Sequence, residues 1–149
     1  MIAQFFVDTN VLVYAYDLGE TKKRQRSVEL LKHLTRTRSG AISAQVLAEF
    51  YVGVTRKIAP PLSPIEAEQQ IGFWLQAWPV VNITGFIVLE AVRGVRQHQM
   101  SFWDAQIWAA AKLNQVPIIL SEDFNSGAVV EGTRFVNPFA EAFDLKSWF

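Results

Sequence analysis

The sequence contains no cysteine and only two histidines, His33 and His98, which lie far apart in the chain. The absence of cysteine excludes disulfide bonds, thiol nucleophiles, iron–sulfur clusters and cysteine-based zinc sites. Two distant histidines argue against a histidine-rich metal site within one chain. Any metal ion would therefore have to be held mainly by carboxylates.

Charged residues are also scarce, at 19% of 149 residues, whereas half of the residues are hydrophobic. This composition excludes a disordered chain and predicts a single domain over residues 1–149 that buries its own core. The formal net charge is zero, from 14 basic and 14 acidic residues. Taken as a bulk number, this balance argues against a strongly basic nucleic-acid-binding protein.

Neither a sorting signal nor a membrane span is expected. The apolar N-terminal run has no basic residues before it and is interrupted by Asp8. The uncharged stretch 69–89 contains several polar residues and a central Pro79, which predict a helix, a break and a strand in place of one span. We therefore expect a soluble, cytoplasmic protein with no membrane partner.

Short apolar runs alternate with longer amphipathic stretches along the whole chain. The pattern predicts strands at about 3–7, 40–43, 80–83, 117–120 and 134–136. It predicts helices at about 9–16, 21–38, 44–56, 64–78, 85–98 and 102–114, four of them preceded by a Ser or Thr N-cap. Such alternation favours parallel pairing, so the expected fold class is α/β: a three-layer α/β/α sandwich with a mostly parallel central sheet.

Four acidic residues fall near the expected carboxyl edge of this sheet, where open parallel sheets bind ligands. Asp8 follows the first strand, Glu49 lies in the helix after the second, Asp104 begins the helix before the fourth, and Asp123 follows the fourth. Carboxylates gathered together repel, and a divalent cation relieves that repulsion. Oxygen-only ligands suit Mg²⁺ or Mn²⁺, which can activate water to hydrolyse a phosphodiester.

Each acid also has a purely structural interpretation. Asp8 can be a helix N-cap, and Asp104 stands three residues after Ser101 in a variant of the capping box. Asp123 lies in a turn-rich loop, and Glu49 falls on the flank of its helix, where a surface acid is the simpler assignment. Their joint placement, and the nearly all-apolar helix that Asp104 begins, favour a shared site.

Several motifs together resemble those of the PIN-domain ribonucleases, and most of all the VapC toxins of bacterial toxin–antitoxin pairs. The motifs cover most of the chain and occur in the order of that family: Val7-Asp8-Thr9-Asn10-Val11-Leu12, Ala48-Glu49-Phe50, Ser101-Phe102-Trp103-Asp104-Ala105, Leu120-Ser121-Glu122-Asp123-Phe124 and Asn137-Pro138-Phe139.

The resemblance implies an Mg²⁺- or Mn²⁺-dependent endoribonuclease that forms homodimers and is blocked by a small antitoxin protein. It implies catalytic roles for Asp8, Glu49, Asp104 and Asp123, with Asp8, Asp104 and Asp123 as metal ligands. It further implies supporting hydrogen bonds from Asn10, Ser101 and Ser121. Many members carry Thr-x-Asp-x-Asp-Phe at the fourth motif, whereas this chain has Ser121-Glu122-Asp123-Phe124, so a share of the role of Asp123 is left open for Glu122.

Half of the basic residues, seven of 14, lie between Lys22 and Arg38. Such a run is typical of a solvated helix face, and it is also suited to binding RNA phosphates or an acidic partner. The candidates for phosphate contacts are Lys22, Lys23, Arg24 and Arg26. The tryptophans Trp74, Trp78, Trp103 and Trp108 are expected to pack in the core, with a dimer or antitoxin groove as the alternative.

Two other functions compete with the nuclease. A phosphatase of the haloacid dehalogenase type also places an Asp after its first strand, but its acid/base Asp two residues later is Asn10 here, which cannot exchange a proton near neutral pH. An inactive PIN-like module that binds RNA or protein is the non-enzymatic alternative. The presence of all four acids favours the enzyme.

Overall fold

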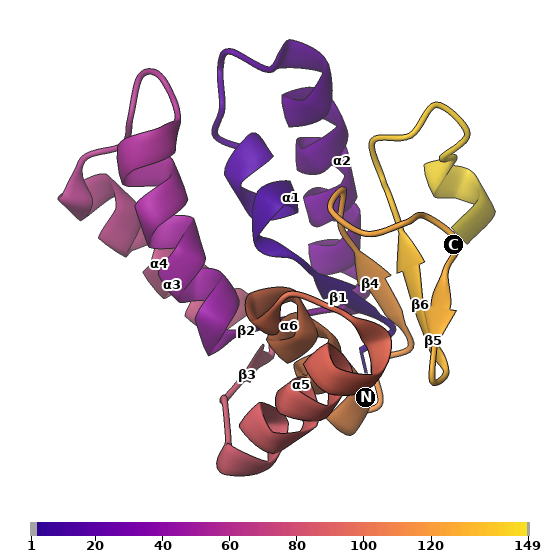
Figure 1. Ribbon diagram of the computed structural model, residues 1–149. Helices are drawn as coiled ribbons and strands as arrows, with labels where there is room; N and C mark the ends of the chain where they lie inside the picture. The colour runs from indigo at the N-terminus through magenta and orange to yellow at the C-terminus, as the bar shows by residue number, and fades with distance from the viewer. Residues whose placement is uncertain (1–2, 149) are drawn as a thin grey trace.

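A mostly parallel sheet forms the centre of the computed structural model, which describes residues 3–148 (Figure 1). Within that range the sheet has six strands in the order β3-β2-β1-β4-β6-β5. Neighbouring strands are parallel except for β5 and β6, which are antiparallel. The strands are β1 (Phe5–Val7), β2 (Gly40–Ser43), β3 (Val80–Val81), β4 (Ile118–Leu120), β5 (Val129–Val130) and β6 (Thr133–Val136).

Helices cover both faces of this sheet. The helices α1 to α4 pack on one another on one face, and α5 and α6 pack together on the other (Figure 1). Right-handed connections between parallel strands require this division, because the strand order reverses direction after β3. The helical segments are α1 (Thr9–Tyr14), α2 (Thr21–Thr37), α3 (Ala44–Val52), η1 (Gly53–Lys57), α4 (Pro64–Ala77), α5 (Gly85–His98), α6 (Phe102–Leu113) and η2 (Leu145–Trp148). The predicted three-layer α/β/α sandwich is confirmed.

The expected N-caps begin four of these helices. Ser43, Thr84 and Ser101 each accept a hydrogen bond from a backbone N–H in the first turn of α3, α5 and α6. Ser63 and Glu66 form the complete capping box of α4, with Pro64 at the first helical position. These caps satisfy backbone donors that the helix itself leaves unpaired.

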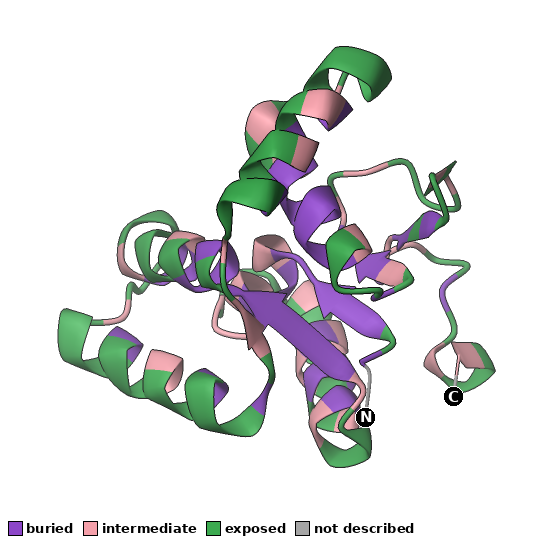
Figure 2. Ribbon diagram, turned by 90° about the horizontal axis from the view of Figure 1, so that it is seen from below, coloured by how far each residue is buried: buried purple, intermediate pink, exposed green. Residues whose placement is uncertain are grey.

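Helix α6 and the central strands form the core, which Figure 2 shows as the buried centre of the molecule. All seven residues of α6 from 105 to 111 are buried. The largest of them, Trp108, donates its indole N–H to the Val130 carbonyl oxygen and packs beneath Arg93 and Lys112. The helix is therefore fixed along its length, and its first turn is held firmly at the carboxyl edge of the sheet.

Three details differ from the sequence-based predictions. Strand β5 was missed. It has only two residues and is followed by a turn at Glu131 and Gly132, both with positive φ, so the alternation of apolar and polar residues is too short to detect. The helix predicted at 44–56 is α-helical only to Val52 and continues as one π-helical turn, η1. Trp103 is 60% exposed, so core packing is wrong for this tryptophan and confirmed for Trp74, Trp78 and Trp108.

Within residues 3–148, no helix combines the length and apolar character needed to cross a bilayer.

Candidate active site

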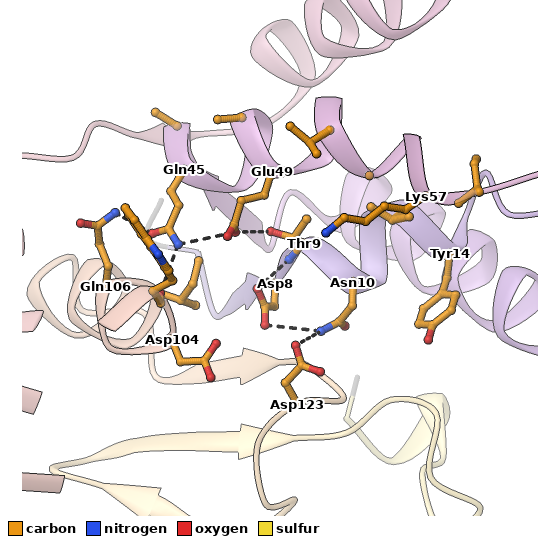
Figure 3. Close-up of a pocket in the computed structure, with 18 of the residues that line it drawn as sticks. Asp8, Thr9, Asn10, Tyr14, Gln45, Glu49, Lys57, Asp104, Gln106 and Asp123 are labelled. Atoms are coloured by element: carbon orange, nitrogen blue, oxygen red, sulfur yellow. Dashed lines mark hydrogen bonds between the residues drawn. The ribbon is translucent and has the colours of Figure 1, made fainter. Parts of the chain in front are cut away.

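A pocket of about 970 Å³ opens at the carboxyl edge of the sheet, between α1, α3, η1 and the N-terminus of α6. All four acids singled out in the sequence line it: Asp8, Glu49, Asp104 and Asp123. Figure 3 shows the carboxylates of Asp8, Asp104 and Asp123 directed into the same space. The fold therefore brings together side chains that are up to 115 residues apart in the chain, from Asp8 to Asp123.

Asp8 is the most buried of the four acids, with 4% of its surface exposed. Its carboxylate accepts hydrogen bonds from the Ser121 hydroxyl and from the Thr9 backbone N–H, both at 2.7 Å. Burial raises the pKa of Asp8 to about 6, against the opposing effect of these two hydrogen bonds, and the charges of Asp123 and Asp104 add to the rise. The bond from Thr9 also makes Asp8 the N-cap of α1, so the structural role and the site role coincide.

Asn10 and Ser121 link the acids to one another. The Asn10 side-chain amide donates to Asp123 Oδ2 at 3.1 Å and to Ser121 Oγ at 3.2 Å, and it lies 3.5 Å from Asp8 Oδ2. The Ser121 hydroxyl donates to Asp8 and accepts from the backbone N–H of Asp123 at 3.1 Å. Asn10 thus contacts the carboxylates of both Asp8 and Asp123, and Ser121 joins the Asp8 carboxylate to the backbone of Asp123.

Asp104 stands in the first turn of α6 and is half-buried. Its backbone N–H donates to the Ser101 hydroxyl at 3.4 Å, so Ser101 acts as the expected cap. Burial raises the pKa of Asp104 above its usual value; a hydrogen bond with Ser101 opposes the rise, and the charge of Asp123 adds to it. Capping therefore fixes the backbone while the carboxylate of Asp104 remains in the pocket.

Glu49 lies inside the site, and the surface position suggested by its helix flank is wrong. The residue is half-buried in α3, and its Oε1 accepts a hydrogen bond from the Thr9 hydroxyl at 2.8 Å. Gln45, one turn earlier, lies 3.5 Å from the same oxygen. Thr9 is the contact that sequence reasoning missed, although its place between Asp8 and Asn10 in the first motif was a usable signal.

Glu122 points away from the acids and does not line the pocket. It accepts hydrogen bonds from the Tyr14 hydroxyl and, at 2.9 Å, from the Lys23 ammonium group, which also stacks over the Tyr14 ring. These contacts raise the pKa of Lys23. Asp123 is therefore the residue of the fourth motif that faces the other acids, and Glu122 anchors the loop to α1 and α2.

We expect Glu122→Gln to leave the affinity for Mn²⁺ within about twofold of wild type, whereas Asp123→Asn weakens it at least tenfold. The ion pair of Glu122 with Lys23 is partly exposed, so its loss should cost less than about 1 kcal/mol of stability. Isothermal titration of Mn²⁺ into each variant measures the difference. A tenfold loss in Glu122→Gln would instead make Glu122 a ligand.

The pocket fits a divalent cation. Its acidic donors are all oxygens, and mutual repulsion among Asp8, Asp104 and Asp123 contributes to the raised pKa values of the first two. Within residues 3–148, no three acidic or histidine side chains close in tightly enough to enclose an ion by themselves. An arrangement of this kind is compatible with a divalent ion that is held by one or two carboxylates and keeps several waters.

The four basic residues proposed for RNA contacts do not line this pocket. Lys23 is paired with Glu122, and Arg26 donates to the Pro138 carbonyl oxygen at 2.6 Å. Lys22 and Arg24 are exposed on α2. Two of the four thus hold the fold together, and the other two remain candidates for phosphate contacts.

Structure comparison finds relatives that share this fold. A toxin–antitoxin complex from Klebsiella pneumoniae matches with a TM-score of 0.66 and 22% identity, over 89% of this chain and 96% of that chain. VapC20 of Mycobacterium tuberculosis, a sarcin–ricin loop cleaving toxin, matches with a TM-score of 0.60 and 18% identity, over 77% and 86%. FitAcB from Neisseria gonorrhoeae matches with a TM-score of 0.62 and 18% identity, over 91% and 98%.

Sequence comparison gives a second, independent result. No curated protein matches the chain. The family model of the PIN domain matches residues 5–129, which include all four acids and the strands and helices that carry them. The chain therefore belongs to the PIN domain family.

Proposed function

We propose that this chain, acting as one domain over residues 1–149, is a Mg²⁺- or Mn²⁺-dependent endoribonuclease and the toxin of a toxin–antitoxin pair. The observation that carries the proposal is the convergence of Asp8, Glu49, Asp104 and Asp123 on one pocket of a PIN domain. The toxin role is supported by the similar folds, which come from toxin–antitoxin complexes and from a toxin that cleaves the sarcin–ricin loop.

In this proposal Asp8, Asp104 and Asp123 would hold the ion together with bound waters, some of them through such a water. When bound, the divalent ion supplies Lewis acidity: it acidifies water for attack on phosphorus and offsets the charge that builds on the phosphate oxygens. Asn10 contacts the carboxylates of Asp8 and Asp123, and Ser121 joins the Asp8 carboxylate to the backbone N–H of Asp123, so the two residues keep these acids side by side. Neither residue needs to exchange a proton, which suits hydrolysis by water better than an aspartyl-phosphate mechanism.

Glu49 is the acid that the proposal assigns to the attacking water. Its Oε1 is anchored by Thr9, while its Oε2 has no hydrogen-bond partner among the described residues. An anchored carboxylate with one free oxygen can orient a water molecule and accept its proton. Glu49 thus has a role distinct from that of the three aspartates.

The direct test is cleavage of total cellular RNA by the purified protein with Mn²⁺ present. We expect fragments with wild type and at least a hundredfold slower cleavage by Asp104→Asn, because a ligand of the ion is lost. Asp144→Asn, an exposed aspartate outside the pocket, is the matched control and should cut like wild type. Absence of cleavage by wild type, or full activity of Asp104→Asn, would contradict the proposal. Mapping the ends of the fragments would identify the target RNA.

The proposed partners are an RNA substrate, a small antitoxin and a second copy of the chain in a homodimer. Apolar side chains exposed on α5 support a protein interface on that helix: Phe86, Leu89 and Val92. Growth arrest on expression in a bacterial host, absent with Asp104→Asn, would test the toxin role apart from the in vitro activity.

A further inference from the structure

The charges around the pocket are strongly one-sided. The acidic residues that line it are Asp8, Asp17, Glu20, Glu49, Asp104 and Asp123, and among the described lining residues the only basic one is Lys57. A polyanionic substrate approaching this surface is repelled unless positive charge offsets the acids. Lys57 is the side chain of the pocket that can supply it, beyond any bound cation.

Local backbone geometry places Lys57 there. It is the last residue of η1, the π-helical turn that begins at Gly53. A Cβ atom on Gly53 would lie 2.8 Å from Val13 Cγ2, so only glycine lets this turn pack so closely on α1. Val54 within the turn and Ile58 directly after it are buried and fix the turn against the core. The resulting position of Lys57 depends on a π-turn, which the sequence pattern did not predict.

The ammonium group of Lys57 is available for a ligand. The side chain is exposed and makes no hydrogen bond or ion pair with any residue in the range 3–148. Figure 3 shows it extending from the α3 side of the pocket toward Thr9 and the acids beyond. Arg56, its neighbour in η1, is also exposed but does not line the pocket.

Trp103 supplies an aromatic surface beside Asp104. Its backbone carbonyl oxygen accepts a hydrogen bond from Gln45 at 3.1 Å, and Gln45 in turn accepts from Gln106 at 2.8 Å. The Phe102 ring packs edge-on against the indole at 5.0 Å. The residue is thus fixed in place, it lines the pocket, and 60% of its surface is exposed.

We propose that Lys57 and Trp103 form a substrate subsite across the acids, in which Lys57 binds an RNA backbone phosphate and Trp103 stacks on an unpaired base. The proposal rests on the nuclease function and names how that site holds its strand. An ammonium group provides a point charge for phosphate, and an exposed indole offers a face on which any base can stack. A base enclosed in a duplex has no free face, so the subsite selects single-stranded or loop RNA.

Binding of a fluorescent 12-nucleotide single-stranded RNA to the Asp104→Asn background, which should not cut it, tests Lys57. Adding Lys57→Gln should weaken binding about five- to tenfold and reduce the slope of log K against log salt by about 0.7, the loss of one phosphate contact to a single strand. Lys57→Arg should restore both values. Arg56→Gln, on the same turn, is the matched control and should change neither.

Trp103 is tested with the same RNA carrying 2-aminopurine at each position in turn. Stacking on the indole should quench the fluorescence at one position, and Trp103→Ala should abolish that quenching and weaken binding about tenfold. Trp103→Phe should retain most of both effects. Phe73→Ala removes an aromatic that is 49% exposed outside the pocket, and it should leave RNA binding unchanged.

Unchanged affinity and salt slope in Lys57→Gln, or unchanged quenching in Trp103→Ala, would overturn the subsite. A change of oligomeric state in Trp103→Ala with normal RNA affinity would do so as well, and would assign the indole to a protein contact. If wild type cuts RNA and Asp104→Asn does not, any of these three results refutes the subsite and leaves the nuclease function standing. If wild type cuts no RNA, the nuclease function fails together with it.

Discussion

Replacement of Asp8 by asparagine should abolish RNA cleavage and at the same time stabilise the metal-free protein at neutral pH. Asp8 is the buried member of the carboxylate group, and its two hydrogen bonds offset only part of the free-energy cost of burying its charge. Asparagine has nearly the same shape and no charge. We expect a loss of at least a thousandfold in cleavage rate, because the most enclosed ligand of the proposed ion is removed.

The sign of the stability change follows from the pKa of Asp8. Its folded-state value of about 6 lies above the ordinary 3.8, so the folded protein binds this proton more tightly than the unfolded chain does. The stability gained from that proton is complete below about pH 4 and is lost as the pH rises through 6. The shift of about two pH units corresponds to about 3 kcal/mol at pH 7.5.

Asparagine carries no titrating charge, so the variant does not lose stability as the pH rises. It weakens the hydrogen bond from Ser121, which costs about 1 kcal/mol of stability. The net gain at pH 7.5 is about 1–2 kcal/mol, or a rise in Tm of about 2–8 °C. Thermal unfolding in EDTA at pH 7.5 and pH 4 measures it, and the gain should disappear at pH 4. A variant that is less stable than wild type at pH 7.5 would contradict the electrostatic argument, and Asp144→Asn should show no change at either pH.

The acids at the strand ends were predictable because their positions follow from topology. Asp8 and Asp123 directly follow the parallel strands β1 and β4, and parallel strands deliver their carboxyl ends to one edge. Asp104 was placed by the direction of α6, which begins at that edge and runs toward the opposite one, where β4 starts. The capping pattern and the site are compatible. Asp8 caps α1, and the backbone N–H of Asp104 bonds to the Ser101 cap of α6, while both carboxylates still line the pocket.

Other parts of the site depend on contacts that no local pattern encodes. Glu49 lies on a helix flank, and whether a flank faces solvent or a pocket is decided by the neighbouring α1, whose Thr9 binds it. Lys57 depends on one π-helical turn and on the space left by Gly53. The two residues of the fourth motif could be separated only by their partners, because Lys23 and Tyr14 come from distant positions to hold Glu122 outside the pocket.

Net charge is a further case in which an average concealed the arrangement. The 14 basic residues balance the 14 acidic ones over the chain. Six acidic residues nevertheless line one pocket, and seven basic residues lie between Lys22 and Arg38. Metal ions that bind in the pocket and neutralise its acids would give the metal-bound protein a net charge more positive than the formal value of zero. A zero sum is therefore compatible with binding RNA, provided that the acids are screened where the strand passes.

Lowering the pH from 7.5 to 4.5 should weaken the binding of Mn²⁺ at least thirtyfold. A ligand carboxylate must lose its proton to bind an ion, and with a pKa of about 6 only about 3% of Asp8 is ionised at pH 4.5. The raised pKa of Asp104 acts in the same direction. Mn²⁺ titration followed by electron paramagnetic resonance measures the free ion at each pH.

The variant Ser121→Ala tests whether Asp8 is the group that titrates. The Ser121 hydroxyl lowers the pKa of Asp8 by donating to its charged form, so its removal should raise the pH at which half of the Mn²⁺ affinity is lost. Glu122→Gln, in the same loop but outside the pocket, should leave that midpoint unchanged. A Mn²⁺ affinity that stays constant from pH 7.5 to 4.5 would remove Asp8 from the set of ligands. A midpoint unmoved by Ser121→Ala would assign the titration to another of the acids, because Asp8 is the carboxylate to which this hydroxyl donates.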